Sequence, residues 1–132
     1  MTTPNPYIGT KGAAMDLIIR QGATCGPNHM AIKDSSGAAI DITGATLRAS
    51  IRKTPDAASI TASAVFTPIT PAAGTVYWSF TAASTTAIVC DPVDEEQPDS
   101  LYVWDMEIEF ADGRILPLLY GDVRVFREVT KV

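Results

Sequence analysis

The stretch "LYVWDMEIEF", residues 101–110, decides the fold, because two sets of residues alternate strictly along it. Successive side chains of a β-strand point to opposite faces, whereas a helix would scatter the aromatic residues around its circumference. The stretch therefore predicts a strand with one face in a core and one face in solvent. The core-facing set is Tyr102, Trp104, Met106, Ile108 and Phe110, and the opposite set is Val103, Asp105, Glu107 and Glu109.

The residues that follow predict that this strand is half of a hairpin. "ADGR" comes directly after it, and Asp112-Gly113 is a favoured hairpin dipeptide because both residues tolerate positive φ. The return strand is predicted within 115–129. Pro117 cannot donate a hydrogen bond to a ladder, so we expect an edge, a bulge or a break there.

Further strand signals recur along the chain, separated by turn residues. They lie at 16–21, 29–34, 38–43, 45–53, 59–66 and 75–81. Between 82 and 100, only 84–89 predicts regular structure, as a single helical turn with Ser84 as its cap. About seven strands without long helical windows predict an all-β fold, an antiparallel β-sandwich over residues 16–132. Residues 1–15 show no periodicity and are predicted to form an extended N-terminal arm.

Length and composition bound the class of protein. The chain has 132 residues, 46% of them hydrophobic, which suits one domain with a substantial core. A net charge of −5 argues against binding to nucleic acid or to an anionic membrane. No signal peptide and no membrane-spanning stretch are expected. Cys25 and Cys90 are interpreted as unpaired thiols, with a single bridge between loops as the alternative.

For each candidate catalytic residue, a structural role is the favoured interpretation. His29 is the only histidine, and no nucleophile motif accompanies it. Glu107 and Glu109 share a strand face, but a general acid needs a pKa raised by burial and that face is expected to be solvated. If the strands at 45–53 and 101–110 are neighbours, Arg48 and Arg52 should pair with these carboxylates.

Two other residue groups are candidate binding sites. The acidic segment contains Asp91, Asp94, Glu95, Glu96 and Asp99, but its spacing matches no calcium-binding loop, and a solubilising loop is favoured. Trp78 and Trp104 lie on apolar strand faces, which indicates core packing more than a sugar-stacking platform. We therefore expect no enzymatic activity, no cofactor and no metal.

Three motifs together resemble a known family. They are the Asp34 to Gly37 turn, the segment Asp41 to Arg52, and the hairpin from Tyr102 to Gly113. Over residues 16–128 the order resembles the immunoglobulin-like β-sandwich domain of tailed-bacteriophage baseplate and tail-fibre adaptor proteins. It is similar to the N-terminal domain of baseplate upper proteins. Many such proteins continue into a fibrous receptor-binding region, so this chain is expected to be a standalone adaptor.

The resemblance implies a structural component of the virion tail or baseplate, assembled in the host cytoplasm. Its partners would be other virion proteins and further copies of itself. The partner contacts are predicted at Tyr7 and Ile8 in the arm, and at Asp94, Glu95 and Glu96 in the acidic segment. A frayed terminus is the plain alternative for the arm. For the whole chain, the alternatives are a capsid decoration protein and a carbohydrate-binding module that uses Tyr77 or Tyr120.

Overall fold

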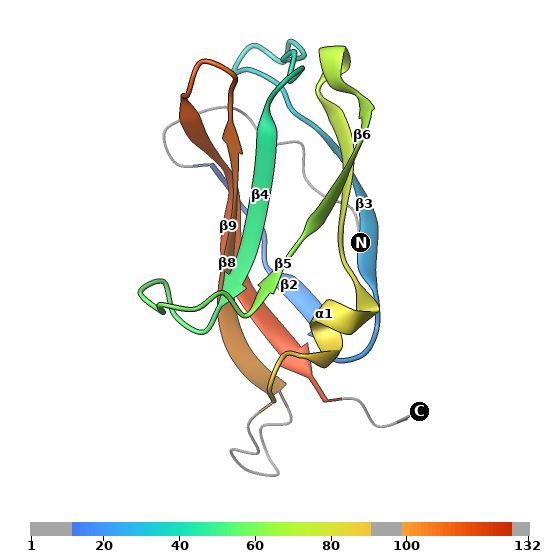
Figure 1. Cartoon of the computed structure of the whole chain (residues 1–132), viewed down its shortest axis with the longest axis vertical. Helices are drawn as coiled ribbons and strands as arrows, with labels where there is room; N and C mark the ends of the chain where they lie inside the picture. The colour runs from blue at the N-terminus through green and yellow to red at the C-terminus, as the bar shows by residue number, and fades with distance from the viewer. Residues whose placement is uncertain (1–11, 91–98, 128–132) are drawn as a thin grey trace.

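Two β-sheets pack face to face in the computed structural model, which describes residues 12–90 and 99–127 (Figure 1). The large sheet has the order β1-β9-β8-β4-β5, with β2 also paired to β9, and the small sheet has the order β3-β7-β6. The large sheet consists of β1 (Ala13–Ala14), β2 (Leu17–Arg20), β4 (Thr46–Arg52), β5 (Ala62–Ser63), β8 (Asp99–Glu109) and β9 (Ile115–Phe126). The small sheet consists of β3 (Cys25–Ala31), β6 (Val65–Thr70) and β7 (Thr75–Phe80), and the short helices are η1 (Pro71–Ala73) and α1 (Ala82–Thr86).

The strand order is that of an immunoglobulin-like sandwich. With β3, β4, β6, β7, β8 and β9 taken as strands B, C, D, E, F and G, the small sheet reads B-E-D and the large sheet reads G-F-C. The predicted fold class is therefore confirmed. The strand at 101–110 lies at the centre of the large sheet, between β4 and β9.

The core lies between the sheets and follows the alternation seen in the sequence. Trp104 of β8 stacks on Trp78 of β7, with ring centroids 5.4 Å apart and planes 26° apart. Both indoles are buried, as are Met106 and Ile108, which confirms that the tryptophans pack in the core. These large side chains supply the apolar burial that stabilises the sandwich.

The hairpin and its proline also agree with the sequence. Gly113 has a φ of 91° and donates its N–H to the carbonyl of Phe110 over 2.9 Å. Across the two strands Met106 pairs with Leu119 and Glu107 pairs with Pro117, so one residue of β9 bulges out. The expected irregularity at Pro117 is confirmed as a bulge.

The N-terminal part of the large sheet differs from the prediction. β1 and β2 run parallel to β9, so the sandwich is not purely antiparallel. Ala13 and Ala14, predicted to be arm, belong to the sheet. A side-chain pattern of period two is the same for both strand directions, and a two-residue strand is too short to show a period.

Three further elements differ between the sequence-based prediction and the structure. The segment 59–66 is not one strand, because it joins the large sheet at β5 and crosses to the small sheet at β6. The segment 38–43 forms only an isolated bridge, between Lys33 and Ala39. The helical turn α1 is present, but its cap is Thr81, whose hydroxyl accepts the Ser84 N–H over 3.2 Å, and not Ser84 itself. Cys25 and Cys90 do not form a disulfide with each other, as expected.

Candidate functional site

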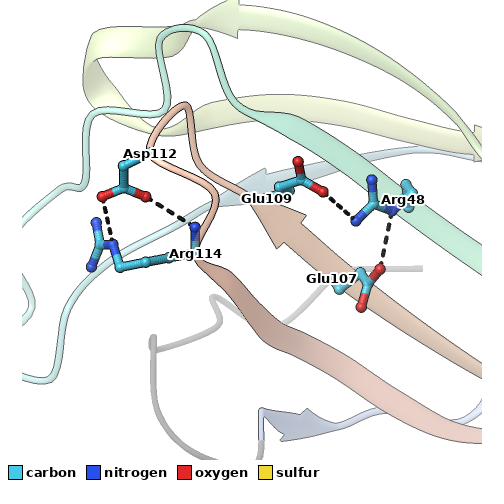
Figure 2. Close-up of polar contacts among 5 residues, drawn as sticks. All are labelled: Arg48, Glu107, Glu109, Asp112 and Arg114. Atoms are coloured by element: carbon cyan, nitrogen blue, oxygen red, sulfur yellow. Dashed lines mark hydrogen bonds and ion pairs between the residues drawn. The ribbon is translucent and has the colours of Figure 1, made fainter.

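On the outer face of the large sheet, charged side chains of β4 and β8 form ion pairs across the two strands. On β4, Arg48 lies opposite Glu107 of β8. It donates from Nε to Glu107 Oε1 and from Nη2 to Glu109 Oε1, both over 3.0 Å (Figure 2). The predicted pairing is thus confirmed for Arg48. Because all three side chains are about 40% exposed, solvent screens both pairs and their net contribution to stability is small.

Arg52 does not join that group of charges. Its Nη1 donates instead to the carbonyl oxygen of Ala57 over 2.8 Å, which holds the loop between β4 and β5 against the sheet. Within this loop Ala57 also donates its N–H to Thr54 O over 3.1 Å. The loop is therefore held beside the outer face of the sheet at the C-terminal end of β4.

Beside the loop between β4 and β5 lies a surface cavity of about 470 Å³, here called the outer-face pocket. Its walls come from β4, β8, β9, the loop after β4 and the corner between β1 and β2. The polar lining residues are Asp16, Ser50, Arg52, Asp105, Tyr120 and Asp122. The other lining residues are Ala14, Pro55, Val103, Trp104 and Gly121.

Strand register explains why these residues meet. Ser50 pairs with Asp105, and Asp105 pairs with Tyr120, so one row of side chains crosses three strands. The next row is Arg52, Val103 and Asp122. Since alternate residues of a strand share a face, both rows project outward from the sheet.

The corner between β1 and β2 is fixed by contacts to β8 and β9. The Met15 carbonyl oxygen accepts the Trp104 Nε1–H over 2.7 Å, and Met15 N–H donates to Tyr120 O over 2.8 Å. Asp16 Oδ1 accepts the Asp122 N–H over 2.9 Å. This close approach requires a glycine at 121, where a Cβ would lie 2.2 Å from Met15 O.

The lining of the outer-face pocket has more acidic than basic side chains. Asp16, Asp105 and Asp122 are three carboxylates, and Arg52 is the single guanidinium among the lining residues. The pKa of Asp105 is raised chiefly by burial and further by the charge of Glu107, and the charge of Arg52 opposes the increase. The pocket therefore favours an occupant that carries positive charge or donates hydrogen bonds.

The raised pKa of Asp105 predicts a pH-dependent effect on stability. An aspartate whose pKa is higher in the folded than in the unfolded state loses stability as pH rises above its ordinary value of 3.8. We therefore expect Asp105→Asn to unfold at a higher urea concentration than the parent at pH 7. At a pH well below 3.8 the aspartate is neutral in both states, and the difference should disappear.

The control for this prediction is Asp112→Asn, which should act in the opposite direction. The backbone N–H and the side chain of Arg114 lower the pKa of Asp112, so its charge favours the folded state at pH 7 (Figure 2). Urea midpoints of the parent and both variants, measured across this pH range, give the comparison. A lower midpoint for Asp105→Asn at pH 7 would contradict the electrostatic description of the pocket.

The other sequence-derived candidates are placed as follows. The predicted contacts Tyr7, Ile8, Asp94, Glu95 and Glu96 lie outside the described residues. His29 is exposed on β3 and meets the Tyr77 ring edge-on at 5.7 Å. Tyr120 lines the outer-face pocket. Sequence reasoning assigned Asp105 only to a solvated strand face, because a single strand does not reveal which neighbours share its row.

Within residues 12–90 and 99–127, no group of three or more histidine, cysteine, aspartate or glutamate residues is arranged to hold a metal ion. In the same ranges no helix is both long and apolar enough to cross a membrane. Comparison with protein-family models and with curated proteins gives no match to this chain.

Proposed function

We propose that the chain is a structural component of a tailed-phage virion, a baseplate or tail adaptor subunit that joins tail proteins or fibres. It would be assembled in the host cytoplasm and would bind other virion proteins and copies of itself, without a catalytic role or cofactor. The observation that carries the proposal is the resemblance of three sequence motifs to baseplate proteins. In the structure these motifs are the turn at 34–37, β4 with the loop before it, and the β8–β9 hairpin.

The turns of these motifs are built by side chains that their sequences specify. Asp34 Oδ1 accepts N–H bonds from Ser36 and Ala38 over 2.9 and 3.0 Å. Asp41 Oδ1 accepts the Thr43 N–H over 2.9 Å just before β4. Aspartates that accept backbone N–H bonds from residues two to four positions later stabilise tight turns. A stiff frame with defined loops and with edge strands such as β3 and β6 suits a joining subunit.

The proposal is tested on phage particles produced from the genome that encodes the chain. We expect the chain to be present in purified particles at a fixed copy number, measured by quantitative mass spectrometry. Antibody labelling viewed by electron microscopy should mark the tail or its tip. Labelling on the head would support the capsid-decoration alternative, and absence of the chain from washed particles would contradict both.

A carbohydrate-binding role is the second candidate, favoured by the lining of the outer-face pocket. Tyr120 offers an aromatic ring beside the polar groups of Ser50, Asp105 and Asp122, a combination of apolar surface and placed polar groups that suits a small ligand. A glycan-array signal that is lost in Tyr120→Ala but kept in Tyr77→Ala would support this role over a purely structural one.

A further inference from the structure

The segment before β1 has a charge opposite to that of the outer-face pocket. Residues 1–11, "MTTPNPYIGTK", contain no carboxylate side chain, and Lys11 is their only charged side chain. The same segment has one apolar pair, Tyr7 and Ile8. In the sequence, a segment with an apolar pair and a cation therefore directly precedes the part of the chain that lines the pocket.

The lining of the outer-face pocket is complementary to this segment in charge and in apolar surface. Its lining has three carboxylates, from Asp16, Asp105 and Asp122, against the one guanidinium of Arg52. Arg52 already donates to Ala57 O over 2.8 Å, so part of its hydrogen-bonding capacity is used within the chain. Pro55 and Val103 add apolar surface to the lining. A positively charged segment with one apolar pair can thus satisfy both parts of the pocket.

The direction of β1 shows which way the chain runs at residues 12–14. Ala13 pairs with Leu119 and Ala14 with Tyr120 in parallel, and a Cβ on Gly12 would lie 3.0 Å from Leu118 O. Followed toward the N-terminus, the backbone at 12–14 therefore moves toward Pro117 and away from Asp122. Eleven extended residues can span at most about 40 Å, which is enough to reach a neighbouring molecule.

We propose that residues 1–11 of one copy occupy the outer-face pocket of a second copy, with Tyr7 and Ile8 against its apolar surface and Lys11 near its carboxylates. This inference rests on the proposed structural role and names the surface through which copies would be joined. Exchange of a segment between copies links protomers without a new folded interface.

Disulfide trapping between two full-length variants tests the proposal. Both variants carry Cys25→Ala and Cys90→Ala, one carries Ile8→Cys, and the other carries Val103→Cys in the pocket. After mixing and mild oxidation, we expect the mixed disulfide dimer to form roughly tenfold faster than with the acceptor Thr67→Cys, because docking raises the effective concentration. Thr67 is a matched control, since it is exposed on β6 of the other sheet.

Charge reversal supplies a second readout. Lys11→Glu in the donor, or Asp105→Lys in the acceptor, should each slow the cross-link. The two reversals together should restore the rate, because the attraction is rebuilt with exchanged signs. Failure of the double reversal to recover any rate would overturn the electrostatic part of the proposal.

The remaining outcomes discriminate between occupants. Equal rates with Val103→Cys and Thr67→Cys would overturn the pocket as the docking surface. An intrachain disulfide in an Ile8→Cys/Val103→Cys chain at high dilution, with no cross-link between mixed copies, would overturn the second copy as the source. If particles contain the chain but no cross-link forms, only this inference fails. If the cross-link forms but particles lack the chain, the virion role fails and the self-association stands.

Discussion

Replacing Trp104 with alanine is expected to lower the free energy of unfolding by about 3–5 kcal/mol, the usual cost of truncating a buried tryptophan. The side chain is only 3% exposed. It stacks on Trp78 and donates to Met15 O over 2.7 Å. Its removal leaves a cavity between the sheets and frees the corner between β1 and β2. A domain of this size has a total stability of about 5–15 kcal/mol, so the loss should be large.

Urea or guanidinium unfolding at pH 7, followed by far-UV circular dichroism, measures this effect. Trp104→Phe is the matched control, because it keeps an aromatic ring in the core and removes the indole N–H. We expect it to cost about 1–2 kcal/mol, mainly through the lost hydrogen bond to Met15 O. A loss below about 1 kcal/mol for Trp104→Ala would contradict the central place of this residue in the core.

Gly121→Ala is the second substitution expected to have a large effect, of about 2–3 kcal/mol, at the upper end of typical overpacking costs. A Cβ at this position would lie 2.2 Å from Met15 O, 2.7 Å from Met15 C and 2.8 Å from Asp16 Oδ1. Two of these atoms belong to the backbone, so no flexible side chain can simply move aside. The corner between β1 and β2 would have to shift away from β9.

Two measurements test the Gly121 prediction. Chemical denaturation should show a greater loss for Gly121→Ala than for Gly113→Ala. At Gly113 a Cβ meets no atom within 4 Å, but φ is 91°, so only a backbone cost of about 1 kcal/mol is expected. Hydrogen exchange at the Asp122 amide should also become faster, because its bond to Asp16 Oδ1 depends on that corner. If both alanine variants lost the same free energy of unfolding, the prediction would be wrong, because the corner between β1 and β2 would then move aside with no additional cost.

These two variants also bear on the proposed docking. Trp104 and Gly121 both line the outer-face pocket, and both hold Met15 in place beside it. A variant that remains folded but has a displaced corner should cross-link more slowly through Val103→Cys. Asp105→Asn, which is expected to be more stable at pH 7, should also cross-link more slowly because it removes a carboxylate. Docking and stability would then change in opposite directions at Asp105.

The sequence alone determined the elements whose signal is local. The alternation at 101–110 and 75–81 assigned Trp78, Trp104, Met106 and Ile108 to the core, and the structure buries all four. Asp112-Gly113 also specified a hairpin correctly, and Pro117 indicated an edge, a bulge or a break, of which the structure shows a bulge. Such features follow from the two-residue period of a strand and from backbone restrictions, which act over a few neighbouring residues.

Only the tertiary structure decided which strands are neighbours. It placed Ala13–Ala14 parallel to β9 and divided 59–66 between the two sheets. It also brought Ser50, Asp105 and Tyr120 into one row and thereby formed the outer-face pocket. The physical reason is that strand direction, register and sheet membership depend on contacts between residues far apart in the chain. A period of two residues is identical for every register that keeps the same face inward.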